Sequence, residues 1–401
     1  MTSANPSSTP PPTPWGLVIL LGALTAMGPL AIDMYLPSLP AIAAGLKADP
    51  AQAQTTVAAF LAGMAVGQPF YGPWSDRIGR RIPLILGAVI FIAGSAACAL
   101  ATSIEFMLVA RFVQALGACA GGVVSRAIIR DRFDHTETAR MLSLMMLIMG
   151  LAPILAPILG SALLVFGWPS NFWFMTAFGV AIGIAALLRL QESRSEATAI
   201  QASKENPFQS YAAVLRSRRL IGYALCGALN GATLFTYIAS SPGLIMGTYG
   251  HSPAVYPWIF GLNALGVIGA GQVNRMVLRR ATPDQVLLRA SLVASIFGAG
   301  LMLAAASGIG GQWTVLPLLF LLLSSYGFMQ GNTMAGALNV DPTRAGAISA
   351  LMGTLSFATG AGAASLAALF HDGSGRAMAV VMLASLIGSA ISLRTLALRP
   401  S

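Results

Sequence analysis

Four ionisable side chains lie inside long apolar stretches, away from the arginines that end these stretches: Asp33, Glu105, Arg111 and Arg126. A charge at the centre of a bilayer costs about 2.5–3.5 kcal/mol on insertion scales, so such groups face the protein interior and have partners. Asp33 is able to bind and release a proton. Burial favours the neutral form of a carboxyl group, and a nearby guanidinium favours the charged form. We therefore predict that Asp33 and Arg111 form a proton-coupling pair.

Asp33 also has a purely structural interpretation. It lies between Pro29 and Pro37, where it could cap or kink a helix near the membrane surface. At the helical rise of 1.5 Å per residue, Asp33 lies about 6 Å and Arg111 about 10 Å below the same surface. The two can meet if their helices are adjacent, which the sequence leaves open. Glu105 lies at the boundary and is expected to be solvated.

The elements that position these residues are predicted membrane spans. Hydrophobic residues make up 56% of the 401 residues and charged residues 9%, against about 25% charged residues in soluble domains. A span needs about 20 apolar residues. Proline is tolerated at the first position of a helix, directly after the capping residue. The predicted fold class is all-α, with twelve transmembrane helices in two six-helix bundles. The predicted spans are 15–37, 52–72, 82–102, 104–128, 138–165, 168–189, 219–245, 252–276, 284–306, 312–338, 343–369 and 374–395.

The basic residues are distributed by side of the membrane. Apart from Arg111 and Arg126 in one span and Lys47 and Arg376 on the outside, every Lys and Arg falls in alternate connections or beside them. This asymmetry predicts that both termini are cytoplasmic. The basic residues form no continuous patch, so the net charge of +10 does not indicate nucleic-acid binding. Cys98, Cys119 and Cys226 have no metal-ligand spacing and imply no disulfide framework.

A polar stretch divides the chain into two halves. We predict a disordered tail at 1–14, a bundle at 15–190, a cytoplasmic linker at 191–217, a second bundle at 218–395 and a tail at 396–401. Such a division is typical of transporters that are built from repeats and bind substrate between the halves near the midplane.

Two segments combine glycine with charged residues or proline. Between the second and third spans stand Gly72, Asp76, Arg77, Gly79, Arg80 and Arg81, and we expect Asp76 to lie at a helix N-terminus or to pair with Arg126 or Arg130. In the fifth span stand Gly150, Pro153, Pro157 and Gly160. Two prolines one turn apart kink a helix, and small residues allow close helix crossing. The second segment therefore predicts a hinge or a close contact between the halves.

These patterns together resemble a known family. The segment from Gly72 to Arg81 resembles the loop signature of the major facilitator superfamily, and Arg111, Gln114 and Gly117 look like its span-4 arginine motif. The fifth span is similar to the superfamily's antiporter motif, with Ala156 and Ser161 where glycine is usual. The segments 33–37, 126–131 and 345–353 resemble the Bcr/CflA drug resistance transporters. The resemblance implies proton-driven efflux, a bacterial cytoplasmic membrane, and a latch between Asp76 and the span that starts near Asp341.

The predicted function is export of small, mostly apolar drugs in exchange for protons by alternating access. We expect the cavity to be lined by Tyr35, Gln114, Met149, Asn230, Phe235, Tyr237, Asn263 and Asn332. We expect no cofactor or metal, and as partners only drug, protons and membrane lipid, with the protein acting as a monomer. A proton-coupled symporter or an exporter of an endogenous metabolite would share the fold. A membrane enzyme is disfavoured because the chain lacks H-E-x-x-H and G-x-S-x-G motifs.

Overall fold

The computed structural model describes residues 15–204 and 207–398, so the predicted tail 1–14 and the last residues of the predicted tail 396–401 lie outside the described residues. Within these ranges the chain forms helices and no strand. Twelve long helices are present: α1 (Trp15–Asp33), α3 (Pro50–Ile78), α4 (Arg81–Ala99), α5 (Ile104–Arg132), α6 (His135–Leu163), α7 (Pro169–Arg189), α10 (Arg218–Pro242), α11 (Tyr256–Val277), α12 (Pro283–Ser307), α13 (Gln312–Val340), α14 (Ala345–Leu369) and α15 (Arg376–Ser392). The twelve predicted spans each correspond to one of these helices.

The helix ends follow local signals in the sequence. Thr282 and Gln285 form a reciprocal capping box at the start of α12, with Pro283 as its first residue. The predicted start at Ser252 is wrong, because residues 253–255 form a turn and α11 begins at Tyr256. α1 ends at Asp33, and a 3₁₀ turn at Leu36–Ser38 and the short α2 (Leu39–Gly45) follow it.

Ten of the helical segments in the described ranges combine the length and hydropathy needed to cross a membrane. The two long helices outside that set, α3 and α11, are the less hydropathic ones, and each contains several amides, including Gln54 and Gln68 in α3 and Asn263 and Asn274 in α11. Both helices pack against the other half of the chain, α3 against α14 and α11 against α6. Their polar residues are therefore sheltered between the bundles, where a helix needs less lipid-facing apolar surface.

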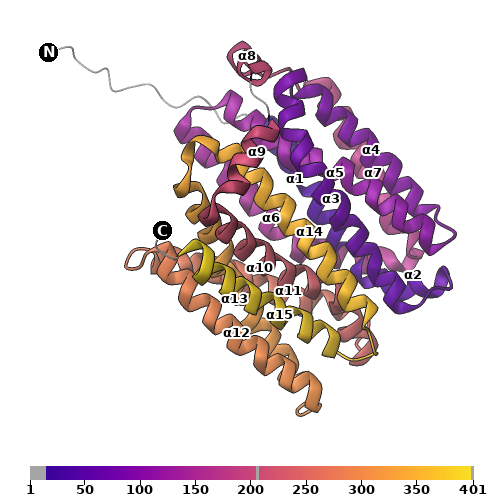
Figure 1. Ribbon diagram of the computed structural model, residues 1–401. Helices are drawn as coiled ribbons and strands as arrows, with labels where there is room; N and C mark the ends of the chain where they lie inside the picture. Colours follow the sequence, from indigo (N-terminus) through magenta and orange to yellow (C-terminus); the bar gives the residue numbers. More distant parts are fainter. Residues whose placement is uncertain (1–14, 205–206, 399–401) are drawn as a thin grey trace.

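The helices form two bundles (Figure 1). α1 and α3–α7 form the first, α10–α15 form the second, and α14 lies along α3 where the two bundles meet. Two short helices, α8 (Glu196–Lys204) and α9 (Pro207–Arg216), lie in the predicted linker. In Figure 1, α8 and α2 mark opposite ends of the bundle. We call the end with α8 the Arg-rich end and the end with α2 the Arg-poor end, after the distribution of basic residues in their connections.

Close helix contacts position α5 at the centre of the first bundle. Gly117 faces the backbone of Phe91 in α4, and Gly121 faces the backbone of Leu24 in α1. A Cβ atom at either position would overlap the facing main chain. These glycines therefore allow α5 to approach two neighbours at once, which places Arg111 deep in the bundle.

Candidate functional site

Asp33 is the last residue of α1 and lies at the interface of the two bundles. Its side chain is 4% exposed, and its Oδ1 atom has no hydrogen-bond partner among the described residues. It lines a cavity of about 190 Å³ between α1 and α6 of one bundle and α10, α11 and α13 of the other. A buried carboxyl without a partner is costly when charged. The position therefore suits a group that is neutral in this conformation and charged in another.

The cavity is small and mostly apolar. It is lined by Asp33, Met149, Gly150, Pro153, Leu234, Tyr237, Ile238, Phe260, Asn263, Ala264, Val267, Ile268 and Leu323. Pockets for drug-sized ligands measure about 300–1,000 Å³. In this conformation the cavity is therefore smaller than the pockets that bind drug-sized ligands.

Arg111 occupies a separate, fully buried site in the first bundle. Its Nη1 donates to the carbonyl oxygen of Ala31 at 2.9 Å and to Oε1 of Gln114 at 2.6 Å. Its guanidinium carbon lies 4.1 Å from the ring centre of Tyr35 and 4.4 Å from that of Phe60. Aromatic faces attract a cation, and the attraction grows when water is excluded. The rings and the carbonyl group together stabilise a charge that has no carboxylate beside it.

The predicted pairing of Asp33 with Arg111 is not observed. No ion pair joins them within residues 15–204 and 207–398, and Nε and Nη2 of Arg111 have no hydrogen-bond partner there. The physical reason is that the guanidinium is held between rings and bound to Ala31, two residues before Asp33. Arg111 therefore contacts the turn of α1 that carries Asp33 without contacting the carboxyl group.

Several of the residues expected in the cavity lie elsewhere. Tyr35 and Gln114 belong to the Arg111 site, where the Tyr35 hydroxyl is 3.0 Å from Thr56 Oγ1 and Gln114 donates to Ser95 Oγ at 2.8 Å. Phe235 packs on Phe357, with ring centres 5.3 Å apart, Asn332 donates to Asn274 at 3.1 Å, and Asn230 is buried away from the cavity wall. Tyr35, Gln114, Phe235 and Asn332 therefore contact residues of their own bundles. Nδ2 of Asn230 has no hydrogen-bond partner among the described residues.

Met149, Tyr237 and Asn263 do line the cavity, together with apolar residues that the sequence analysis missed. The missed residues are Leu234, Ile238, Phe260, Ala264, Val267, Ile268 and Leu323. Leu234, Phe260 and Val267 lie three or four residues from Tyr237 or Asn263, whereas Ile238 and Ala264 directly follow these two residues. Helical periodicity around the two polar residues was the signal that could have identified Leu234, Phe260 and Val267.

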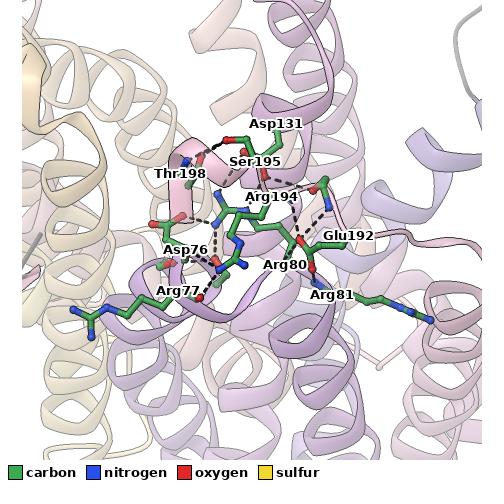
Figure 2. Close-up of polar contacts among 12 residues, drawn as sticks. Asp76, Arg77, Arg80, Arg81, Asp131, Glu192, Arg194, Ser195 and Thr198 are labelled. Atoms are coloured by element: carbon green, nitrogen blue, oxygen red, sulfur yellow. Dashed lines mark hydrogen bonds and ion pairs between the residues drawn. The ribbon is translucent and has the colours of Figure 1, made fainter. Parts of the chain in front are cut away.

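The charged loop after α3 forms an ion-pair cluster at the Arg-rich end (Figure 2). Arg80 pairs with Asp76 and, through Nε at 2.7 Å, with Oδ2 of Asp131 in α5. Its Nη1 also donates to Ser75 Oγ at 2.8 Å, and Arg80 is 3% exposed. Asp76 therefore pairs with Arg80 in the last turn of α3, and neither predicted alternative, a helix N-terminus or a pairing with Arg126 or Arg130, is observed. Arg80 follows Asp76 by four residues, across the turn at Gly79 that separates α3 from α4.

The predicted latch between Asp76 and the start of α14 is also not observed. Asp341 is held by Arg344 at 2.5 Å and by the hydroxyl of Thr343, both in its own turn. The Arg80 cluster instead joins α3 and α5 to the segment after α7, all in the first bundle and the linker. In this conformation Asp76 and Asp341 each form an ion pair with an arginine of their own bundle.

Glu192, which follows α7, caps the N-terminus of α4 (Figure 2). Its carboxylate accepts from the backbone N–H of Arg80 at 2.8 Å and of Arg81 at 3.1 Å, and also from those of Ser193 and Arg194. Partial burial opposes ionisation, but the four backbone donors outweigh it and hold the pKa of Glu192 below its ordinary value. Gly79, at φ 102°, brings the loop against this carboxylate, where a Cβ atom would lie 2.5 Å from Oε2.

Arg194 binds the other helix end at this connection, the C-terminus of α3. Its Nη1 donates to the carbonyl oxygen of Asp76 at 3.3 Å and to that of Arg77, at the C-terminus of α3. Anions stabilise helix N-termini and cations stabilise C-termini. The two linker residues, which the sequence analysis did not single out, therefore fix the α3–α4 connection from outside. We call Glu192, Arg194 and the backbone groups they bind the linker clamp.

We expect Glu192→Gln to lower the unfolding midpoint of the purified protein by a few degrees, a loss of about 1 kcal/mol for a partly exposed charged acceptor. Because the pKa of Glu192 is lowered in the folded state, its contribution is present at neutral pH and is lost as the pH falls through that value. The variant should therefore lose part of the acid dependence of its midpoint, measured by thermal unfolding in detergent. Glu196→Gln, at an exposed residue of α8, is the matched control and should change neither quantity.

Two hydrogen bonds between the bundles lie at the Arg-poor end. Gln54 of α3 donates to Ser240 Oγ of α10 at 2.5 Å, and Ser161 of α6 donates to the carbonyl oxygen of Pro253 at 2.8 Å. Along α6, Gly150 and Pro153 line the cavity, and Gly160 contacts the backbone of Met34. α6 passes through Pro153 and Pro157 as one helix. Its glycine-proline segment thus runs from the cavity to the contact at the Arg-poor end.

Comparison with known proteins agrees with this architecture. The family model described as Major Facilitator Superfamily matches residues 21–364. "Uncharacterized MFS-type transporter YdgK" of Bacillus subtilis is 33% identical over 93% of both chains, and "Multidrug resistance protein MdtL" of Klebsiella pneumoniae is 33% identical over 82% of this chain and 83% of its own. "Bicyclomycin resistance protein homolog" of Haemophilus influenzae is 27% identical over 88% of both chains.

Solved structures show the same fold at low sequence identity. A D-xylose-proton symporter superposes with a TM-score of 0.76 at 12% identity, covering 95% of this chain and 97% of its own. A bacterial homologue of the lysosomal transporter Spinster, in an inward-facing and unoccupied conformation, gives 0.73 at 14% identity, covering 96% and 98%. At these identities the likeness establishes the fold alone.

Proposed function

The chain belongs to the major facilitator superfamily, and we propose that it exports small, mostly apolar drugs across the bacterial cytoplasmic membrane in exchange for protons. The observation that carries the proposal is the buried carboxyl of Asp33 in the wall of a cavity between the two bundles. The relatives named for multidrug and bicyclomycin resistance support drugs as the substrate class.

The proposed coupling works through the charge of Asp33 and does not need an ion pair with Arg111. When Asp33 is neutral, it can lie against Leu234 and Phe260 of the second bundle, so the bundles can close around the cavity. When Asp33 is charged, desolvation disfavours that packing, and the cavity must open to water or to a polar ligand. A proton from outside thus favours closure, and its release inside favours opening toward the drug.

Arg111 has a supporting role in this proposal. Because it holds the carbonyl group of Ala31, it fixes the last turn of α1 that presents Asp33. Its own charge is stabilised by the rings of Tyr35 and Phe60 and by Gln114, so it does not depend on the charge of Asp33.

The proton gradient supplies enough free energy for such a cycle. Each proton that moves inward gains about 2.3 kcal/mol per 100 mV of membrane potential and about 1.36 kcal/mol per unit of pH difference. Alternating access then requires one bundle to move against the other around the cavity. With the Arg-poor end outside, the Gln54–Ser240 and Ser161–Pro253 contacts would close the external side in this conformation.

The proposed orientation places both termini and the linker clamp in the cytoplasm. The Arg-rich connections support this orientation through the preference of basic residues for the cytoplasmic side. We further propose that the protein acts as a monomer, since the cavity and the Arg111 site are both formed within one chain. Lipid and protons are then its only partners besides the drug.

We expect inside-out membrane vesicles that contain the protein to accumulate bicyclomycin, or another neutral antibiotic of a test panel, only when the vesicle interior is acidified. A protonophore should abolish the accumulation, and vesicles without the protein provide the background. The vesicles come from a host that lacks its own efflux pumps. Accumulation that instead requires an outward-to-inward flow of protons together with the drug would assign symport, and saturable exchange without a gradient would argue against a channel.

A further inference from the structure

The hydroxyl of Tyr237 has a hydrogen-bonding capacity that the protein does not use. Its oxygen accepts a hydrogen bond from Nδ2 of Asn263 at 2.8 Å, in the wall of the cavity. A phenol is a donor as well as an acceptor. No acceptor for the Tyr237 proton occurs among the described residues. Because Asn263 occupies the oxygen from its own side, the O–H group is left to donate elsewhere, and the cavity is the space it borders.

The ring that carries this hydroxyl is held in place. It stacks on Phe260, with ring centres 5.6 Å apart and planes at 16°, and Tyr237 is 2% exposed. Phe260 packs in turn on Tyr256, whose own hydroxyl is already bound to Ser241 at 2.8 Å. One aromatic neighbour and one amide therefore fix the position of the donor, so that a ligand meets it with little loss of side-chain entropy.

The remaining wall defines what kind of ligand would use this donor. Apart from Asp33, Tyr237 and Asn263, the lining side chains are apolar. No basic side chain lines the cavity, so an anionic ligand would find no compensating charge there. An uncharged molecule with an apolar body and one acceptor group matches the apolar wall and the Tyr237 donor, and it leaves Asp33 free to bind and release a proton.

We propose that the Tyr237 hydroxyl, positioned by Asn263, forms a subsite that binds a carbonyl or comparable acceptor group of an uncharged transported molecule. This inference deepens the proposed function and rests on it. Tyr237 determines specificity by direct contact with the ligand, and Asn263 is a positioning residue. The subsite belongs to the second bundle and lines the same cavity as Asp33 of the first bundle.

Two competitors that differ by one carbonyl oxygen isolate this contact. Benzophenone and diphenylmethane are both uncharged and aromatic, but only benzophenone has an acceptor. Each is titrated against gradient-driven accumulation of the best-transported antibiotic of the panel in inside-out vesicles. In the wild type we expect benzophenone to inhibit about ten-fold more strongly than diphenylmethane, the effect of one buried hydrogen bond.

Tyr237→Phe keeps the ring and removes the donor, and we expect it to abolish the preference for benzophenone. Tyr256→Phe is the matched control, because it removes a buried hydroxyl that lies outside the cavity wall and should leave the ratio unchanged. Asn263→Leu should give an intermediate ratio with a raised KM and an unchanged maximal rate, as expected of a positioning residue.

The possible outcomes separate this inference from the proposed function. If the wild type accumulates no antibiotic under any gradient, the proposed function fails and the inference falls with it. If accumulation occurs but the two competitors are equal in the wild type, or their ratio persists in Tyr237→Phe, the inference alone is overturned. Loss of the ratio in Tyr237→Phe, with the ratio retained in Tyr256→Phe, supports it.

Discussion

Replacement of Asp33 by asparagine is expected to reduce proton-driven drug accumulation to the background of vesicles without the protein. Asparagine has nearly the same shape and cannot bind or release a proton, so the cavity would be fixed in the state that corresponds to a neutral carboxyl. Asp33 is 4% exposed and has an unpartnered oxygen, so a neutral amide should be tolerated by the fold. The measurement is drug accumulation in inside-out vesicles with and without a pH gradient.

Two controls make this expectation specific. Asp33→Asn should elute as a monodisperse protein with an unfolding midpoint equal to or above that of the wild type, because removal of a buried ionisable group is not destabilising. Glu105→Gln changes a carboxyl in the exposed first turn of α5 and should leave accumulation unchanged. Normal gradient-dependent accumulation by Asp33→Asn would exclude Asp33 as the proton carrier.

The fold was largely predictable because it depends on a property that the sequence displays directly. Long apolar segments separated by polar connections identify membrane helices, and the twelve predicted segments each became a helix. The error at the start of α11 arose from a local competition, because Ser252 can begin either a helix or a turn and the turn formed there. α3 and α11 were also predicted as spans, although both are less hydropathic than the helices that meet the length and hydropathy needed to cross a membrane.

The cavity position of Asp33 agrees with the sequence-based choice of this residue, whereas the contacts around it and Arg111 were not predicted. Asp33 stood out because a carboxyl in an apolar segment is rare for a physical reason. The environment of Arg111 depends on Tyr35 and Phe60, which come from different segments and meet only after the helices pack. No spacing in the sequence encodes that meeting. A charge-pairing rule therefore assigned Arg111 to Asp33, whereas aromatic rings and a carbonyl group surround it.

The charged loop illustrates a different limit. The ion pair of Asp76 with Arg80 joins residues only four positions apart, but it forms across the turn at Gly79, where α3 ends. Glu192 lies more than a hundred residues away in a polar segment, where a carboxylate usually signifies only solubility. Its role depends on the free N–H groups at the start of α4, which the sequence does not place beside it. Contacts between a helix end and a distant linker thus require the structure.

Gly160→Ala is expected to destabilise the protein by about 3 kcal/mol or more, the upper part of the range for overpacked sites. A Cβ atom at Gly160 would overlap the carbonyl oxygen of Met34 and lie 2.7 Å from its carbonyl carbon. Both obstacles are backbone atoms, so no side-chain rotation relieves them. The unfolding midpoint of the purified protein should fall by many degrees, or the protein should fail to accumulate in the membrane.

Gly150 provides the matched control within the same segment of α6. A Cβ atom there would meet Cδ1 of Ile268 at 3.6 Å, an ordinary van der Waals contact, so Gly150→Ala should be close to neutral for stability. Equal stability of Gly160→Ala and Gly150→Ala would show that α1 and α6 are not in close contact in the membrane.

The position of Met34 gives the Gly160 contact a functional consequence. Met34 directly follows Asp33, so the main chain that presents the carboxyl group rests on Gly160 of α6. The same helix lines the cavity through Met149, Gly150 and Pro153. Any Gly160→Ala protein that does insert should therefore show a shifted pH dependence of drug accumulation, since displaced α1 would change the desolvation of Asp33. An unchanged pH profile in such protein would show that the contact between Gly160 and Met34 does not affect proton coupling. The hydrogen bond from Arg111 to the carbonyl oxygen of Ala31 would then be the contact that positions this turn of α1.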